Sequence, residues 1–179
     1  LFLGIFLFWS AVRSTSSQIE GTEKFMNLAF MNAINRSEFM PPPDPWFVGG
    51  TINYYYLGHY IFVFASKIFD IAQAYTYNLA MTSIIAYAFI ASFSIILKLT
   101  AGNEKKRKWA IISAIMGATW LCFGSNLHYF YKWISALFAG QKFTYWFPDG
   151  TRIIPFAIDE FPAYSIVLAD LHGHYLGMP

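Results

Sequence analysis

The sequence predicts an all-α membrane protein of the multi-span helical class, with a polar outer loop and further helices at the membrane surface. Of its 179 residues, 56% are hydrophobic and only 12% are charged, whereas soluble domains carry about 25% charged residues. A mean hydropathy of +0.41 agrees with this class. The net charge of +2 comes without a basic stripe, which argues against a nucleic-acid partner.

The first predicted span is partial. Residues 1–12 are apolar from the first position but shorter than the roughly 20 residues that cross a bilayer. They also lack the basic stretch that opens a signal peptide. We therefore expect them to form the outer part of a first transmembrane helix. Residues 1–179 would then be part of one integral membrane domain of a longer protein.

Two surface helices are expected next. Residues 13–53 are polar and interrupted by Pro and Gly, which indicates a loop outside the hydrocarbon. An amphipathic pattern near residues 24–39 predicts a helix at the interface, ended by the prolines at 41–43. The apolar residues 54–69 predict a second surface helix, because tyrosines open it and tyrosine prefers the headgroup level. A short, tilted span over these residues is the alternative.

Two longer apolar runs, 75–98 and 109–124, predict further spans. A basic cluster at residues 105–108 lies between them, and cytoplasmic loops are enriched in Lys and Arg. This orientation places residues 13–74 and 125–179 together on the outer face of the cell membrane.

Acidic residues are scarce, with ten in the chain, so their positions are informative. Glu23 and Asp44 are the candidate catalytic carboxylates. Glu23 opens the amphipathic helix, either as a general base or metal ligand or only as a charge that the helix dipole stabilises. Asp44 is held between prolines in PPPDPW, and the alternative role for it is to cap a turn.

The densest polar cluster is the segment DLHGHY, residues 170–175. Asp170, His172 and His174 are side chains of the types that bind a divalent metal, here Mg²⁺ or Mn²⁺. Histidines bonded to backbone and water at the interface are the alternative.

The candidate substrate-binding residues lie on the segments expected at the outer face. Tyrosines stack and also hydrogen-bond, which suits a groove for a lipid-linked or sugar substrate, although they also anchor chains at the interface. An arginine can hold a phosphate bidentately, or Arg152 can neutralise Asp149. The full set is Arg36, Tyr54, Tyr55, Tyr56, His59, Arg152 and Glu160.

Two long segments carry a resemblance to a known family. EKFMNLAFMNAINRSEFMPPPDPWFVGGTINYYYLGHY, together with DEFPAYSIVLADLHGHYLGMP, resembles the prokaryotic "YYY" integral membrane proteins, a family of unknown function named for the tyrosine triplet. The resemblance runs from about Glu20 to the end of the chain. One departure is Gly173, where the family usually has DLHPH; glycine loosens that turn and with it a rigid metal geometry.

A more distant resemblance is to the GT-C class of lipid-linked-sugar glycosyltransferases, such as the protein mannosyltransferases and aminoarabinose transferases. The shared order is a span, an outer loop with an early acidic residue, a surface helix, a span, a basic loop and a span. Glu23 matches the acidic position, and residues 54–56 match the aromatic run that follows prolines in the type KPPLYYW.

The GT-C resemblance implies a polyprenyl-phosphate sugar as the donor and Glu23 as the general base for the acceptor. It also implies positive charge on the leaving phosphate, from Arg36, Arg152, His172 or a divalent ion. The alternative function is a non-catalytic membrane scaffold, a lipid-binding protein or a transporter subunit.

Overall fold

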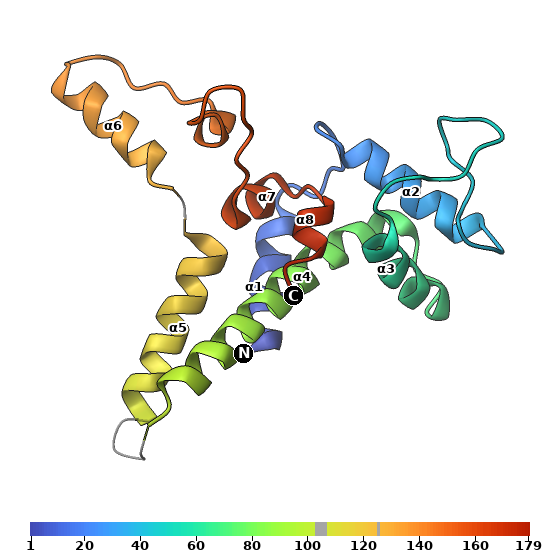
Figure 1. Cartoon of the computed structure of the whole chain (residues 1–179), viewed down its shortest axis with the longest axis horizontal. Helices are drawn as coiled ribbons and strands as arrows, with labels where there is room; N and C mark the ends of the chain where they lie inside the picture. Colours follow the sequence, from blue (N-terminus) through green and yellow to red (C-terminus); the bar gives the residue numbers. More distant parts are fainter. Residues whose placement is uncertain (103–106, 125) are drawn as a thin grey trace.

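The computed structural model describes residues 1–102, 107–124 and 126–179, and Figure 1 shows that helices dominate it. Within these ranges there is no strand, only an isolated bridge between Pro43 and Thr51, so the all-α prediction is confirmed. Lys105 and Lys106 of the basic cluster lie outside the described residues. The helices are α1 (Phe2–Ser14), α2 (Lys24–Arg36), α3 (Leu57–Ile68), α4 (Gln73–Thr100), α5 (Arg107–Phe123), α6 (His128–Phe138), the 3₁₀ helix η2 (Phe147–Thr151), α7 (Pro162–Leu168) and α8 (Gly173–Leu176).

One described helix, α4, is by itself long and apolar enough to cross a membrane. Helices α5 and α6 pass the same test only as a pair, bent by 75°, while α1 and α3 are shorter apolar helices. The runs 75–98 and 109–124 are therefore helical, as predicted from the sequence. Whether α5 crosses the bilayer stays a prediction.

Helices α1, α2, α3 and α5 pack on α4, which is the longest helix (Figure 1). Helix α1 runs antiparallel to it: the Arg13 side chain bonds Asn78 at 2.8 Å, and the Phe2 and Tyr87 rings lie 4.7 Å apart. Helix α5 packs along α4 through small side chains that recur every fourth residue. This spacing lets two backbones approach closely. The buried residues of this stripe are Ala110, Ala114, Ala118 and Cys122.

Helices form in both segments that were expected to lie at the membrane surface, but each helix is shorter than the sequence pattern indicates. Helix α2 ends at Arg36 because Ser37 already has extended backbone, with ψ of 138°, so the predicted end at 39 is wrong. Helix α3 begins after Tyr56, which caps it with a non-helical φ of −127°. The first two tyrosines of the triplet therefore lie in the segment that leads from the Pro43–Thr51 bridge into α3, not in the helix.

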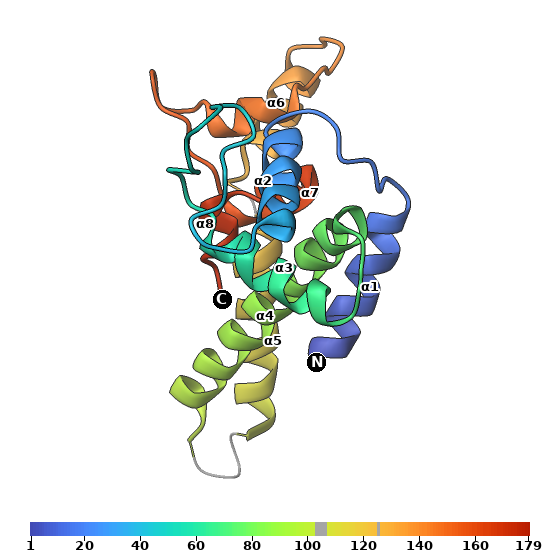
Figure 2. The ribbon, with the colours of Figure 1, turned by 90° about the vertical axis from the view of Figure 1, so that its right-hand side faces the viewer.

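The last two helices close over the first third of α4. The Tyr175 hydroxyl of α8 donates to the Met81 carbonyl of α4 at 2.7 Å, and Leu171 just before α8 is fully buried. Figure 2 shows the result: α2, α3, α7 and α8 gather around one end of α4, while the other end projects away with α5. The two polar regions of the sequence therefore meet at the same end of α4.

Candidate functional site

The start of α2 and the turn between α7 and α8 form one polar cluster. The Asn27 side-chain amide donates to an Asp170 carboxylate oxygen at 3.0 Å across 143 positions of sequence, and both residues are buried. Asn27 lies one helical turn after Glu23, on the same face of α2. The contact therefore brings Glu23 to the 170–174 turn.

Tyr77 of α4 positions this turn. Its hydroxyl donates to the Ala169 carbonyl at 3.0 Å and accepts the Leu171 amide at 3.1 Å, so it closes the turn from both sides. Ala169 has a φ of +56°, a left-handed backbone that costs a non-glycine residue of order 1 kcal/mol or more. The tyrosine contacts stabilise a strained turn immediately before Asp170.

Glu23 and His172 form the centre of the cluster. A Glu23 carboxylate oxygen lies 3.1 Å from Nδ1 of His172, and an Asp170 oxygen lies 3.9 Å from the same nitrogen. The Glu23 side chain is 46% exposed, against 12% for Asp170. Glu23 is thus the accessible carboxylate, while Asp170 is held by Asn27. A carboxylate beside an imidazole is an arrangement that can accept and pass on a proton.

A second carboxylate–histidine pair lies beside the first. Nε2 of His174 is 2.9 Å from a Glu160 oxygen and 2.8 Å from the Ser165 hydroxyl. The His172 and His174 rings are 5.0 Å apart. Glu160 therefore lies at the cluster through His174, while its predicted role in binding a substrate stays a prediction.

The three ligands predicted for a divalent metal do not converge on one point. His174 faces Glu160 and Ser165, whereas His172 faces Glu23 and Asp170. Among the described residues, no group of three or more His, Cys, Asp and Glu side chains is arranged to hold a metal ion. A bound Mg²⁺ or Mn²⁺ stays a prediction, and the geometry describes two acid–base pairs instead.

The tyrosine triplet is divided among three environments. Tyr54 is 45% exposed and its ring lies 3.9 Å from that of Tyr55. Tyr55 is half-buried, with its ring 5.3 Å from His172, so it alone touches the cluster. Burial raises the pKa of the Tyr55 hydroxyl, which is therefore neutral at ordinary pH. Tyr56 packs against the hydrophobic core.

The close packing of the Tyr55 ring on the 170–174 turn requires glycine at position 173. A Cβ at this position would lie 2.8 Å from two ring atoms of Tyr55. We expect Gly173→Ala to displace the ring and to destabilise the fold by about 1–3 kcal/mol, measured as a lower thermal midpoint. Gly4→Ala on α1, where a Cβ would meet nothing, is the matched control. If Gly173→Ala were as stable as Gly4→Ala, the close packing of Tyr55 on the turn would be contradicted.

His59 lies directly behind the cluster and is fully buried. Neither ring nitrogen has a hydrogen-bond partner, although backbone of Tyr55 and Leu171 lies beside the ring. Burial lowers the pKa of His59 to about 4, so the ring is neutral. It packs edge-on against Phe30 and does not reach an open surface.

Because His59 is buried and neutral, we expect the stability of the folded protein to depend on pH. Unfolded histidine titrates near 6.5 and folded His59 near 4, so the unfolded state binds more protons between these values. Stability should fall as the pH drops from 6.5 to 4, by about 3 kcal/mol in total. We expect His59→Gln to flatten the change of thermal midpoint with pH in this window, and His128→Gln on α6 to leave it unchanged. Identical pH profiles for wild type and His59→Gln would refute the assignment.

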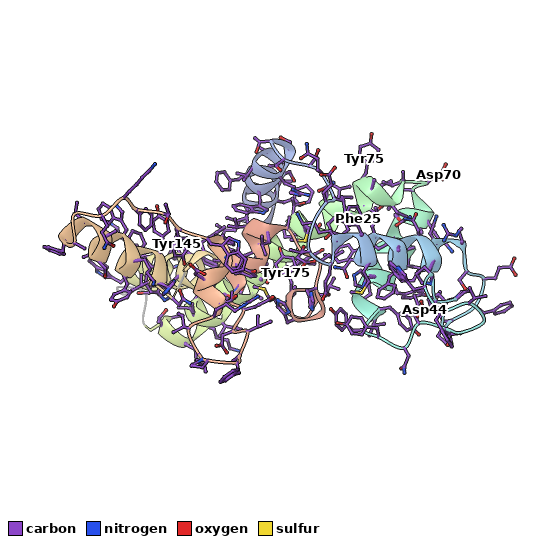
Figure 3. The ribbon with its side chains drawn as sticks, turned by 90° about the horizontal axis from the view of Figure 1, so that it is seen from above. Phe25, Asp44, Asp70, Tyr75, Tyr145 and Tyr175 are labelled. Atoms are coloured by element: carbon purple, nitrogen blue, oxygen red, sulfur yellow. The ribbon has the colours of Figure 1, made fainter. Side chains whose placement is uncertain are left out.

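Three predicted residues lie outside the cluster. Asp44 accepts the amides of Trp46 and Phe47 at 2.8 and 3.1 Å, which is the turn-capping alternative, and it lies near Arg36 at the far end of α2. A helix of this length separates them from Glu23 by about 20 Å. Figure 3 shows Asp44 well apart from Tyr175 of α8. The Arg152 guanidinium donates to the Thr151 hydroxyl at 2.6 Å, and Arg152 bonds Asp149 only through its backbone amide, which donates to the Asp149 carbonyl at 3.1 Å.

Sequence reasoning missed Asn27, Tyr77 and Ser165. Each is a common polar residue whose role depends on a partner far along the chain, so no local motif marks it. Asn27 carried one usable signal, its spacing of four residues from Glu23.

Comparison with known proteins gives one match. The family model described as an uncharacterized membrane protein (DUF2298) matches residues 1–179. No curated protein and no solved structure gives a significant match. The expectation of a membrane protein family of unknown function is confirmed at that level.

Proposed function

The chain belongs to the DUF2298 family of uncharacterized membrane proteins, and we propose that it is a membrane glycosyltransferase of GT-C type that uses a polyprenyl-phosphate-linked sugar. The observation that carries the proposal is the Glu23–His172 pair, 3.1 Å apart. It unites the two segments on which the YYY resemblance rests, and Glu23 is the acidic position of the GT-C resemblance. A scaffold would have no need for an exposed carboxylate poised on an imidazole.

The proposed site lies at the outer surface of the cell membrane. It surrounds the first third of α4, whereas Lys98 lies near the opposite end of α4 and Arg107 opens α5 there. By the enrichment of basic residues on the cytoplasmic side, that opposite end faces inward. Residues 13–74 and 125–179 then share the outer face, and α3 lies along the surface.

In the proposed reaction, Glu23 accepts the proton of an acceptor hydroxyl as its oxygen attacks the anomeric carbon of the sugar. The new glycosidic bond forms as the bond from the anomeric carbon to the phosphate oxygen breaks. The polyprenyl phosphate leaves with that electron pair. Nδ1 of His172 lies 3.1 Å from the Glu23 carboxylate, and Asp170, which Asn27 fixes, lies 3.9 Å from the same nitrogen, so the imidazole can stabilise the charge of both carboxylates.

The experiment is a transfer assay with the full-length protein in proteoliposomes. Polyprenyl-phosphate sugars labelled in the sugar serve as donors, and membranes of the source cells supply the acceptor. Release of free polyprenyl phosphate together with labelled product is expected. If the folded, inserted protein turns over no donor of the panel, the alternative of a non-catalytic scaffold, lipid-binding protein or transporter subunit holds instead.

A further inference from the structure

A cavity of about 640 Å³ lies beside the candidate site, between α1, α4 and α2. Its walls are apolar where Ile19, Leu28 and Leu79 line it. Polar groups gather on α1 and along α4, where Arg13, Ser10 and Asn78 contribute. The cavity thus combines an apolar wall with one cationic group, and none of its lining residues belongs to the Glu23–His172 pair.

Arg13 has unused hydrogen-bonding capacity in this cavity. Of the five N–H donors of a guanidinium, three are used, by the Asn78 side chain and by the carbonyls of Ser16 and Gln18. One donor remains on each terminal nitrogen, and a phosphate can accept hydrogen bonds from both. In the described part of the chain Arg13 has no salt bridge to a carboxylate. Within the described residues, no carboxylate in contact with Arg13 neutralises its positive charge.

A second cation connects the cavity to the site. Lys24 follows Glu23 and, in the described residues, also lacks a salt bridge. Burial and the charge of Arg13 lower the pKa of Lys24, while Asp170 and Glu20 act in the opposite direction. Lys24 therefore lies close enough to both Arg13 and Asp170 to sense their charges. Lys24 thus directly follows the proposed base Glu23 in the sequence and lies within electrostatic range of Arg13 in the cavity.

One buried polar atom in the cavity wall is unsatisfied. The Ser10 hydroxyl is inaccessible to solvent and has no hydrogen-bond partner. A buried hydroxyl without a partner is costly. Because this hydroxyl is closed to solvent, a ligand in the cavity could accept from it only after the Ser10 side chain rotates toward the cavity.

We propose that this cavity binds the phosphate of a polyprenyl-phosphate lipid, with the prenyl chain along the apolar wall and the phosphate between Arg13 and Lys24. This proposal rests on the proposed function, and it gives the place where the polyprenyl-phosphate sugar donor binds. A sugar on that phosphate points past Lys24 toward Glu23. Arg13 and Lys24 then supply the positive charge for the leaving phosphate, which the GT-C resemblance assigns to Arg36, Arg152, His172 or a divalent ion.

The test is equilibrium binding of a radiolabelled polyprenyl monophosphate, without sugar, to the full-length protein in nanodiscs. We expect Arg13→Gln to weaken binding at least about tenfold, because hydrogen bonds to charged groups are lost, and Arg13→Lys to weaken it less. Ala74→Trp, at an exposed position of the cavity wall, should weaken binding by occupying the cavity. Ala74→Trp is needed as a second variant because the Arg13 side chain also bonds the chain just after α1, so Arg13→Gln can change the local fold. Lys132→Gln on α6, an exposed cation elsewhere, should bind as wild type does.

Competition experiments distinguish a polyprenyl phosphate from other phosphate-containing ligands. Unlabelled polyprenyl phosphate should displace the label, while inorganic phosphate and phosphatidylglycerol should not at similar concentration. Unchanged affinity in both Arg13→Gln and Ala74→Trp, or equal displacement by phosphatidylglycerol, would overturn the proposal. Glu23→Gln separates the two claims, because it should keep binding and lose transfer. Binding without transfer in the wild type would remove the proposed function and leave the lipid site standing.

Discussion

Glu23→Gln is expected to reduce sugar transfer by about a hundred- to ten-thousand-fold, the range that a general base contributes. The amide cannot accept a proton, but it retains the size of the carboxylate. The fold and donor affinity should therefore change little, and the loss should fall on kcat. The measurement is the initial rate of transfer in proteoliposomes, with folding checked by the thermal midpoint.

The matched control for this variant is Glu20→Gln. Glu20 is an exposed carboxylate three positions earlier in the same loop, and it makes no contact to the histidine pair. It should transfer sugar at the wild-type rate. If Glu23→Gln were as active as Glu20→Gln, Glu23 would not be the base.

Tyr77→Phe is expected to have the largest effect on stability. Removing the hydroxyl leaves the amide of Leu171 and the carbonyl of Ala169 without their partner, and both residues are buried. Each unsatisfied group costs about 1–3 kcal/mol, so the free energy of unfolding should fall by about 2–6 kcal/mol. The strained turn at Ala169 should loosen, and transfer should fall with it because Asp170 and His172 follow directly.

Two measurements check this expectation. The thermal midpoint gives the stability, and hydrogen exchange reports protection of the Leu171 amide. Tyr87→Phe, at a half-exposed position of the same helix, is the control and should be near neutral. A Tyr77→Phe protein with wild-type stability and a protected Leu171 amide would show that the turn holds without this tyrosine.

The helices could be predicted from the sequence because their signals are local. The apolar runs gave α4 and α5 within two residues at each end. The predicted ends of α2 and α3 differ more from the ends that the structure shows. Extended backbone at Ser37 and the approach of the chain from the Pro43–Thr51 bridge set these ends, and neither has a local sequence signature.

The site could be predicted only in part. Glu23, Asp170 and the two histidines stood out because charged and histidine residues are rare in so apolar a chain. Arg36 and Asp44 belong to the same polar region of the sequence as Glu23, but they lie at the C-terminal end of α2, whereas Glu23 lies at its N-terminal end. Asn27 and Tyr77 act through contacts across more than 90 positions, which composition and spacing do not encode.

The most direct test of the account is the side of the membrane on which the site lies. Cys122, which is buried, is replaced by serine in the full-length protein. Single cysteines are placed at Glu20, Ala101 and Asp149, and intact cells are treated with a membrane-impermeant thiol reagent. The account predicts labelling at Glu20 and Asp149 but not at Ala101. Labelling at Ala101 with protection of the other two would place the Glu23–His172 pair on the cytoplasmic side and contradict it.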